Sequence, residues 1–460
     1  MRVIAGVPLA FAGAAILCRL WLLHPPRAIA IDLAQPVPVV TYWQTFGSAM
    51  WLALFIAVAV GGWCYAAALR DALAGTFART HRALWAIGVA SAAALVAAIA
   101  FPVIFSSDVY AYGAYGVMAQ HSIDPYAHDV LRLHDPLVRA AIWQWSNPPP
   151  VCVYGPLFVE LARAVVTLLG GFGPAAQLLG LRVAASLALI ACGPLLYAAL
   201  RGYPSSQRIG AAIGITLNPI AIWSCAEGHN DALMLVVVLF GVTLVRSSKP
   251  LAGAFAIACS CLVKAPGIAA AFALAVYSWP VRGRFARVVA GAAIGTALTA
   301  LIALPFEWGV RNVLVPHGHY TPQFSLQYLG SLIAGNYGIA AALIGIGALA
   351  IAGLRQTVMG RREGFALLAL ALWLVIPNPY PWYALWILPV AFASIGTRGS
   401  WAIIIASLAA VFRYLPDATT ASSTSTNALV TLCMLGIPFA VYAARQRAQN
   451  VVTSAPPGNP

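Results

Sequence analysis

Apolar runs long enough to cross a membrane alternate with short polar stretches along almost the whole chain. The first three cover about 3–23, 48–69 and 83–104, and at ~1.5 Å per helical residue each matches the ~30 Å of a hydrocarbon core. The pattern predicts an all-α polytopic membrane protein with about fourteen transmembrane helices, within a range of about 12–14. The later predicted crossings are 176–200, 209–225, 231–246, 251–263, 267–280, 288–305, 338–354, 365–377, 382–396, 401–414 and 428–444.

Composition and charge agree with this class. Of the 460 residues, 62% are hydrophobic and 8% are charged, whereas a soluble domain carries about 25% charged residues. The net charge of +14 comes mainly from short basic loops, which together with Arg2 hold 17 of the 26 Lys and Arg residues, with Asp71 and Glu363 as their acids. Because such loops mark the cytoplasmic side, the charge predicts orientation in a lipid bilayer and not a nucleic-acid partner.

This orientation places both termini inside and organises the rest of the chain. A crossing at 151–174 would put Arg201 and Arg208 outside, so we predict an interfacial helix over 154–170 that lies on the outer surface. We expect a single integral membrane domain over 1–444 and a disordered cytoplasmic tail over 445–460. The large extracytoplasmic segments are then 105–150 (a candidate catalytic loop), 225–231, 306–337 and 377–383.

The outer segment 105–126 begins where the third apolar run ends, and it carries the first candidate for chemistry. Read as a helix, it places Asp108, Tyr112 and Tyr115 on one face, at i, i+4 and i+7. The turn signal Asp124-Pro125-Tyr126 then ends the helix. A carboxylate above two aromatic hydroxyls, in a chain so poor in charge, indicates a polar site.

Two roles are open for Asp108. A partly desolvated carboxylate at the membrane boundary is expected to have a raised pKa, which would suit a general base. An aspartate that follows Ser106-Ser107 is also a common N-cap for a helix over 109–119. The sequence pattern alone leaves both roles open.

A second polar group lies in the corner between the runs at 209–225 and 231–246. Glu227, His229, Asn230 and Asp231 stand next to a strongly apolar run. The bland interpretation is a polar turn in which Asp231 caps the following helix. Because polar side chains are costly at membrane depth and mark functional sites there, the sequence favours a cluster that orients substrate.

Two cations lie within or between apolar runs and are candidates for binding a phosphate. Lys264 precedes the helix-breaking Pro266-Gly267, and Arg182 lies inside the run at 176–200. Both side chains can also snorkel to the interface, or hold a phosphate as a point charge or a bidentate fork. Lys264 is the stronger candidate, because a broken helix adds backbone groups to the site.

The chain shows no recognisable metal site. Its histidines outside the apolar runs match no compact zinc-ligand spacing. An acid-assisted Mg²⁺ or Mn²⁺ site stays open, although the pattern does not indicate one. We therefore assign no metal ligands and no cofactor. The histidines of the predicted outer segments are His121, His128, His134, His317 and His319.

Taken in order, these features resemble the GT-C glycosyltransferases, and most of all the bacterial polyprenol-phosphate-mannose-dependent α-(1→6)-mannosyltransferases. The resemblance spans roughly 83–390 and is carried by the following motifs: Ser107-Asp108-Val109-Tyr110, Asp124-Pro125-Tyr126, Tyr154-Gly155-Pro156-Leu157-Phe158, Asn218-Pro219, Gly228-His229-Asn230-Asp231, Lys264-Ala265-Pro266 and Pro381-Trp382-Tyr383.

The resemblance implies a function and a place. It implies transfer of a hexose, mannose by the closest members, from a polyprenyl-phosphate donor to a glycan or glycolipid acceptor, with inversion and with Asp108 as general base. It implies a multi-pass protein of the bacterial inner membrane with its site on the extracytoplasmic side. Their polar, basic or aromatic side chains make further residues candidates for contact with the substrate, namely Tyr112, Asp124, Tyr126, Arg182, Glu227, His229, Asn230, Asp231, Lys264, Trp382 and Tyr383.

Alternatives to this interpretation remain open. The aromatic side chains among these residues either stack on sugar faces or form an interfacial belt. Intramembrane charges and broken helices also serve a lipid or solute transporter or flippase, although no repeat symmetry between the halves is visible. A non-catalytic assembly partner for envelope polysaccharide synthesis would keep the fold and would not need Asp108.

Overall fold

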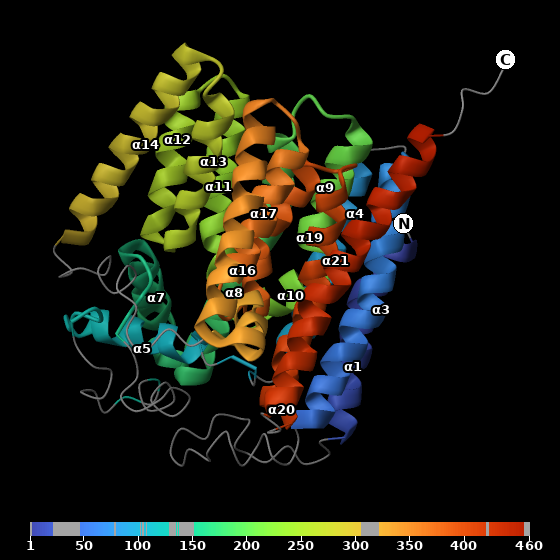
Figure 1. Cartoon of the computed structure of the whole chain (residues 1–460). Coiled ribbons are helices and arrows are strands. Elements are labelled where there is room, and N and C mark those ends of the chain that lie inside the picture. Colours follow the sequence, from blue (N-terminus) through green and yellow to red (C-terminus); the bar gives the residue numbers. More distant parts are fainter. Residues whose placement is uncertain are drawn as a thin grey trace. The chain divides into compact units, whose positions relative to one another are not determined.

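The structure is a computed structural model of the chain, drawn in Figure 1. Every regular element among the residues it describes is a helix, which confirms the predicted all-α class. Contacts divide the chain into two compact units: unit 1 is Met1–Tyr320 with Asp417–Thr420, and unit 2 is Thr321–Pro416 with Ala421–Pro460. The predicted single domain over 1–444 stays a prediction. The described residues are 2–21, 47–77, 80–101, 103, 105–106, 108–127, 135, 137, 151–304, 322–419 and 423–454.

Unit 1 contains the predicted interfacial helix and the polar corner with Glu227, His229, Asn230 and Asp231. In Figure 1 α1 pairs with α3, and α12, α13 and α14 group beside α11. Short 3-10 turns lie at η1 (Arg2–Ala5), η4 (Gly170–Phe172), η5 (Ser260–Leu262) and η6 (Ala265–Gly267). The helices are α1 (Gly6–Trp21), α3 (Ser48–Leu73), α4 (Thr80–Ile99), α5 (Asp108–Gln120), α7 (Pro156–Leu169), α8 (Pro174–Ala199), α9 (Ser205–Thr216), α10 (Pro219–Ala226), α11 (Asp231–Arg246), α12 (Pro250–Cys259), α13 (Ile268–Ser278) and α14 (Arg282–Ala303).

Unit 2 is built from long α16 and α21 and from shorter helices between them. Its elements are α16 (Leu326–Val358), α17 (Glu363–Val375), η8 (Pro381–Tyr383), α18 (Ala384–Ala393), α19 (Arg398–Ala409), η9 (Ala410–Tyr414) and α21 (Thr424–Ser454), while α20 (Leu415–Thr419) lies across the division of the chain. α21 extends to Ser454 and so into the segment predicted as a tail; 455–460 lie outside the described residues.

The predicted membrane class is confirmed, but the count of about fourteen crossings is not. Within the described ranges, six helices are long and apolar enough to span a bilayer, or seven if the bent pair α9–α10 is one span. Several other predicted crossings form apolar helices too short for this test. These are Val3–Cys18, Pro250–Leu262, Ala265–Ser278, Glu363–Val375 and Pro381–Ala393.

The predicted outer helices form as α5 and α7, and they pack against each other. α5 begins at Asp108, as the sequence predicted for a helix over 109–119. α7 buries one side, including Phe158 and Ala162, and exposes Leu157 and Leu168. This two-faced pattern is typical of the predicted interfacial helix, whose place at the outer surface stays a prediction.

The bend between α9 and α10 explains why the polar corner lies inside unit 1. The two helices meet at 42°, where Pro219 starts α10 without a backbone N–H and the Asn218 side chain accepts hydrogen bonds from the N–H groups of Ile220 and Ala221. α10 is short and fully buried. It therefore ends with the corner 227–230 buried among other helices.

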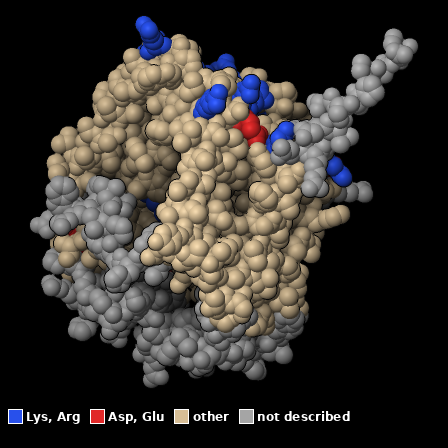
Figure 2. All heavy atoms as spheres, viewed as in Figure 1, with Lys and Arg blue, Asp and Glu red and all other residues tan. Residues whose placement is uncertain are grey.

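In unit 2, α17 and α19 begin at the same end. Glu363, the first residue of α17, accepts a hydrogen bond at 3.3 Å from the N–H of Gly399 in α19. The basic residues Arg355, Arg361 and Arg362 lie at this end and are exposed. Figure 2 shows Lys and Arg side chains near the top of the view, and the described surface below them on this face is mostly uncharged. This distribution is typical of a cytoplasmic membrane boundary.

Candidate functional site

The carboxylate of Asp108 is the centre of a buried polar cluster in unit 1. The backbone N–H of Asp108 donates to Ser106 Oγ at 3.2 Å, so Ser106 provides a local cap and the Asp108 carboxylate points elsewhere. Its Oδ2 accepts from the hydroxyls of Tyr112 and Tyr154, each at 3.3 Å. The N-cap interpretation of Asp108 is therefore not what this geometry favours.

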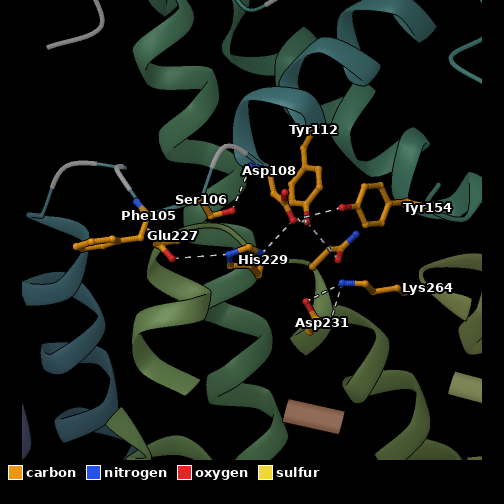
Figure 3. A network of polar contacts seen from close by, with 10 residues as sticks. Phe105, Ser106, Asp108, Tyr112, Tyr154, Glu227, His229, Asp231 and Lys264 are labelled. Carbon is orange, nitrogen blue, oxygen red and sulfur yellow. Dashed lines mark hydrogen bonds and ion pairs between the residues drawn. The ribbon is translucent and has the colours of Figure 1, made fainter. Parts of the chain in front are cut away.

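His229 lies between two carboxylates, as Figure 3 shows. Its Nδ1 is 3.4 Å from Asp108 Oδ2, and its Nε2 is 3.7 Å from Glu227 Oε2. Glu227 is buried in turn and accepts a hydrogen bond at 3.2 Å from the backbone N–H of Phe105. A chain of groups thus runs from the segment before α5, through the corner after α10, to the Asp108 carboxylate.

In this chain of groups, burial and the neighbouring side chains shift the pKa values in opposite directions. Burial raises the pKa of the Asp108 carboxyl, but contact with His229, with smaller effects from Lys264 and Tyr112, outweighs burial and holds the pKa below its ordinary value. Burial lowers the pKa of His229, but Asp108 and Glu227 outweigh it and raise that pKa. The sequence-based expectation of a raised Asp108 pKa is wrong, because it did not include this histidine.

The local chain conformation brings His229 to Asp108. Gly228 has φ +99°, a region that residues with a Cβ seldom adopt. A Cβ on Gly228 would lie 2.8 Å from Val109 Cγ2 and 3.4 Å from the Arg182 side chain. The corner after α10 therefore fits closely against the start of α5. The polar residues of this corner and Asp108 of α5 thus form a single site.

Lys264 and Asp231 form a buried ion pair beside the Asp108 group. Lys264 Nζ is 2.9 Å from both carboxylate oxygens of Asp231, and it lies 5.5 Å from the centre of the Tyr154 ring. The break between η5 and η6 directs Lys264 into the site (Figure 3). Asp231 is the first residue of α11, where the sequence offered it as a helix cap. Its carboxylate instead pairs with Lys264.

Asn230 adds a hydrogen-bonding group to the same cluster. Its side chain is fully buried, and its Oδ1 lies 3.5 Å from the Tyr112 hydroxyl. In the part of the chain that the structure describes, its Nδ2 has no hydrogen-bond partner. A buried donor without a partner is costly, so this amide is suited to an oxygen atom of a bound substrate.

Tyr154 belongs to the site although the sequence interpretation did not select it. Its ring is edge-to-face with that of Tyr112 at 5.0 Å, and its hydroxyl donates to Asp108. Its backbone carbonyl accepts a 2.7 Å hydrogen bond from the Tyr126 hydroxyl, and Asp124 accepts one from the Tyr126 N–H at 2.9 Å. Asp124 and Tyr126 therefore position Tyr154, whose only sequence signal was the motif at 154–158.

Arg182, a predicted phosphate ligand, is bonded in the structure to backbone carbonyls. Its guanidinium donates to the carbonyl of Ala226, and to those of Ile99 and Phe101 at 3.1 and 3.2 Å. These carbonyls lie at the C-terminal ends of α10 and α4, where helices leave acceptors unpaired. The side chain thus ties the ends of two helices together close to the site.

Trp382 and Tyr383 lie in unit 2. One face of Trp382 is covered by Tyr380, at 4.5 Å and 9°, and Tyr383 stacks on Trp386 at 4.2 Å. Sugar stacking on these two rings stays a prediction.

As to metals, the described residues contain no group of three His, Cys, Asp or Glu side chains placed to hold an ion. His128, His134, His317 and His319 lie outside those residues.

Fold and site together define an integral membrane protein with a buried acid–base cluster at the ends of broken helices. Residues 30–282, more than half of the chain, match the family model described as alpha-(1->6)-mannopyranosyltransferase, N-terminal domain. The chain belongs to this family, which confirms the resemblance to α-(1→6)-mannosyltransferases. The match includes every candidate site residue of unit 1.

Individual relatives agree with the family match. The chain is 25% identical over 355 residues to alpha-(1->6)-mannopyranosyltransferase A of Mycobacterium tuberculosis, covering 66% of each protein. It is 28% identical over 145 residues to alpha-(1->6)-mannopyranosyltransferase B of Corynebacterium glutamicum (31% of this chain, 23% of that protein), and 27% identical over 188 residues to alpha-(1->6)-mannopyranosyltransferase A of the same organism (40% and 37%). The matches thus span less than two thirds of each relative's length. No solved structure matches the chain.

Proposed function

We propose that this protein is a membrane mannosyltransferase that moves mannose from a polyprenyl-phosphate donor to a hydroxyl of a glycan or glycolipid, on the extracytoplasmic side of the bacterial inner membrane. Family membership supports the mannosyl group and the transfer. Relatives named as α-(1→6) enzymes support attack by a primary hydroxyl of the acceptor. The lipid donor fits a chain that places its polar cluster among apolar helices.

The observation that carries the proposal is the setting of Asp108. The carboxylate is mostly buried, with 15% of its side chain exposed, and three side chains fix its Oδ2. It stands at the start of α5, just after the candidate span His81–Ile99. A fixed carboxylate at the end of a span is suited to a substrate whose lipid chain stays in the bilayer.

In the proposed step, the acceptor hydroxyl gives its proton to Asp108 while its oxygen bonds to C1 of mannose. The bond from C1 to the phosphate oxygen breaks, and its electron pair leaves with polyprenyl phosphate. Attack from the face opposite the phosphate inverts the configuration, from a β-linked donor to an α-linked product. The neighbours that hold the pKa of the Asp108 carboxyl below its ordinary value keep it ionised throughout the neutral range, so the carboxylate has a site open for the proton.

The other buried groups have matching tasks in this proposal. His229 stabilises the ionised form of Asp108 and is itself stabilised by Glu227. Lys264 is a cation beside Asp108, and its pairing with Asp231 means that the phosphate shares it with a carboxylate. The Asn230 amide provides a donor for a sugar hydroxyl or a phosphate oxygen.

A transfer assay on the purified full-length protein tests the proposal. The protein is incubated with labelled polyprenyl-phosphate mannose and a short α-mannoside acceptor in lipid vesicles. We expect a new α-(1→6) linkage in the acceptor and release of polyprenyl phosphate in equal amount. Movement of intact donor across the vesicle membrane without a glycosidic product would instead identify a flippase, and would refute the proposed function.

A further inference from the structure

Unit 2 contains a second polar cluster, which the proposed transfer does not use. Its centre is Arg413 in η9, a buried side chain with 4% exposure. The guanidinium carbon lies 4.2 Å from the centre of the Phe324 ring and 4.6 Å from that of Tyr380. Arg413 Nε donates to Asn378 Oδ1 at 3.1 Å. Arginine stacks readily on aromatic faces, and its planar fork of N–H groups matches the geometry of a phosphate.

The depth of this cluster follows from helix lengths. α17 and α19 start together at the basic end, and Asn378 and Arg413 meet beyond their other ends. Arg413 lies fifteen residues after Arg398, or about 22 Å along a helix. With the basic end at the cytoplasmic boundary, the cluster lies inside the ~30 Å hydrocarbon layer, roughly two thirds of the way across.

The beginning of α16 lies beside the same cluster, because Phe324, two residues before the helix, contacts Arg413. α16 is two helices joined at Ala334 and Gly335, where the backbone leaves the helical region. The short first helix folds back on the second so closely that a Cβ on Gly338 would lie 1.8 Å from the Gly330 carbonyl oxygen. This fold-back brings Phe324 to Arg413, with Phe324 in the left-handed region at φ +54°. A bulky residue seldom adopts that conformation, and such residues cluster at functional segments.

Gln327 provides the second sign of a ligand. Its Nε2 donates to the carbonyl of Val375 at 3.0 Å, next to the Asn378 turn. Its Oε1 is buried and has no hydrogen-bond partner among the residues described. An arginine and an acceptor oxygen, at membrane depth and beside the stacked Tyr380–Trp382 pair, suit a ligand that carries both an anion and hydroxyl groups.

We propose that the Arg413 cluster of unit 2 binds the head of a lipid-borne phosphate ester that also carries hydroxyl groups. Arg413 would pair with the phosphate, and Gln327 Oε1 would accept from a hydroxyl. The lipid chain would remain among apolar helices. The cluster lies outside the family match at 30–282. The assignment to a substrate lipid rests on the proposed function, whereas binding of such a head group does not.

Photo-crosslinking on the full-length protein in nanodiscs tests this site without any turnover. The probe is polyprenyl-phosphate mannose with a diazirine in its first isoprene unit, and labelled peptides are mapped by mass spectrometry. We expect labelling of 324–327 or 376–383, blocked by unlabelled polyprenyl-phosphate mannose and not by polyprenol. Labelling confined to unit 1 would overturn the proposal.

Matched variants sharpen the test. Arg413→Gln should lower labelling of these segments about tenfold, the loss expected for one charge-assisted contact. Arg361→Gln, the same change at an exposed arginine of unit 2, should leave labelling unchanged. Equal labelling of a folded Arg413→Gln variant would overturn the site. If that variant does not fold, the competition on the wild-type protein decides. Labelling that polyprenol blocks as well as polyprenyl-phosphate mannose does would then overturn the site.

Two further experiments identify the source of the phosphate and distinguish this proposal from the proposed function. Competition by phosphatidylinositol that equals competition by the polyprenyl donor would support the phosphate site and assign it to membrane phospholipid. Asp108→Asn should keep the labelling of unit 2, because crosslinking requires no transfer. Failure of mannosyl transfer together with intact labelling would therefore refute the proposed function alone.

Discussion

At the level of single residues, His229 determines how Asp108 behaves. Its imidazole stands between two carboxylates, and removal would leave Asp108 buried without its main stabilising neighbour. The charge of the proposed general base therefore depends on a residue 121 positions later in the chain. This dependence leads to a prediction about pH.

We predict that His229→Gln moves the acid limb of the pH–rate profile to higher pH. In the proposed step Asp108 must be ionised, so the rate should fall when the pH drops below the pKa of that carboxyl. Burial raises that pKa and His229 is the largest influence that lowers it, so the variant has the higher pKa. The measurement is kcat/KM from pH 3 to pH 8. An acid limb at the wild-type position would contradict the proposed coupling.

The Lys264–Asp231 pair makes a separate prediction about stability. Removing one member of a buried ion pair leaves an uncompensated charge, at a cost of about 3–5 kcal/mol in the free energy of unfolding. Lys264→Ala should show this loss, and Asp231→Asn added to it should recover most of the loss. Thermal unfolding in detergent measures both variants. Exposed Lys249→Ala is the control, and a Lys264→Ala loss no larger than the control's would contradict the prediction.

Single residues also show where sequence reasoning succeeds and where it stops. Asp108, Glu227, His229, Asn230 and Lys264 were selected because polar groups are rare in apolar surroundings, and the structure brings them together (Figure 3). Their pairing was not predictable, because it depends on contacts between residues far apart in the chain. A tyrosine such as Tyr154 gives no comparable signal, since aromatics are common in membrane proteins.

At the level of elements, close approach of backbones holds the site together. Gly155 precedes α7, and its N–H donates to the carbonyl of Val263 at 3.0 Å. A Cβ on Gly155 would lie 2.2 Å from the carbonyl of Leu262. Tyr154 and Lys264 flank these contacts, so the packing of one segment on the other sets the distance between them.

We therefore predict that Gly155→Ala both destabilises the protein and slows transfer. The added methyl group would push the 152–156 segment away from η5 and shift the Tyr154 hydroxyl from Asp108, and overpacking of this kind costs about 1–3 kcal/mol. Gly171→Ala is the matched control, because a Cβ there meets no atom within 4 Å. Melting temperature and kcat measure the two effects. Equal values for the two variants would refute this account of the segment.

Helices were easier to predict than their breaks. Apolar runs and the turn at Asp124-Pro125 predicted α5 within a residue or two, because both signals are local. The fold-back at the start of α16 escaped prediction, since it depends on contact between Gly330 and Gly338. Short runs were counted as crossings, whereas α17 has 13 residues and extends only about 20 Å.

At the level of the whole molecule, charge predicts the orientation of the chain in the membrane. A cysteine at Val130, in the predicted outer loop, should react with a membrane-impermeant maleimide on intact cells. A cysteine at Arg361, on the basic end of unit 2, should react only after the membrane is opened, because positive loops stay inside. Reaction of both from the same side would refute the predicted sidedness.

The central claim is that Asp108 accepts the proton of the acceptor, and Asp108→Asn tests it most directly. Asparagine keeps the size and polarity of the side chain but cannot act as this base. We expect transfer to fall about 10²–10⁴-fold while binding of polyprenyl-phosphate mannose stays near the wild-type value. The control is Asp135→Asn, at another outer-segment aspartate, whose Oδ1 accepts from the Leu137 N–H. Near-normal transfer by a folded Asp108→Asn protein would contradict the account.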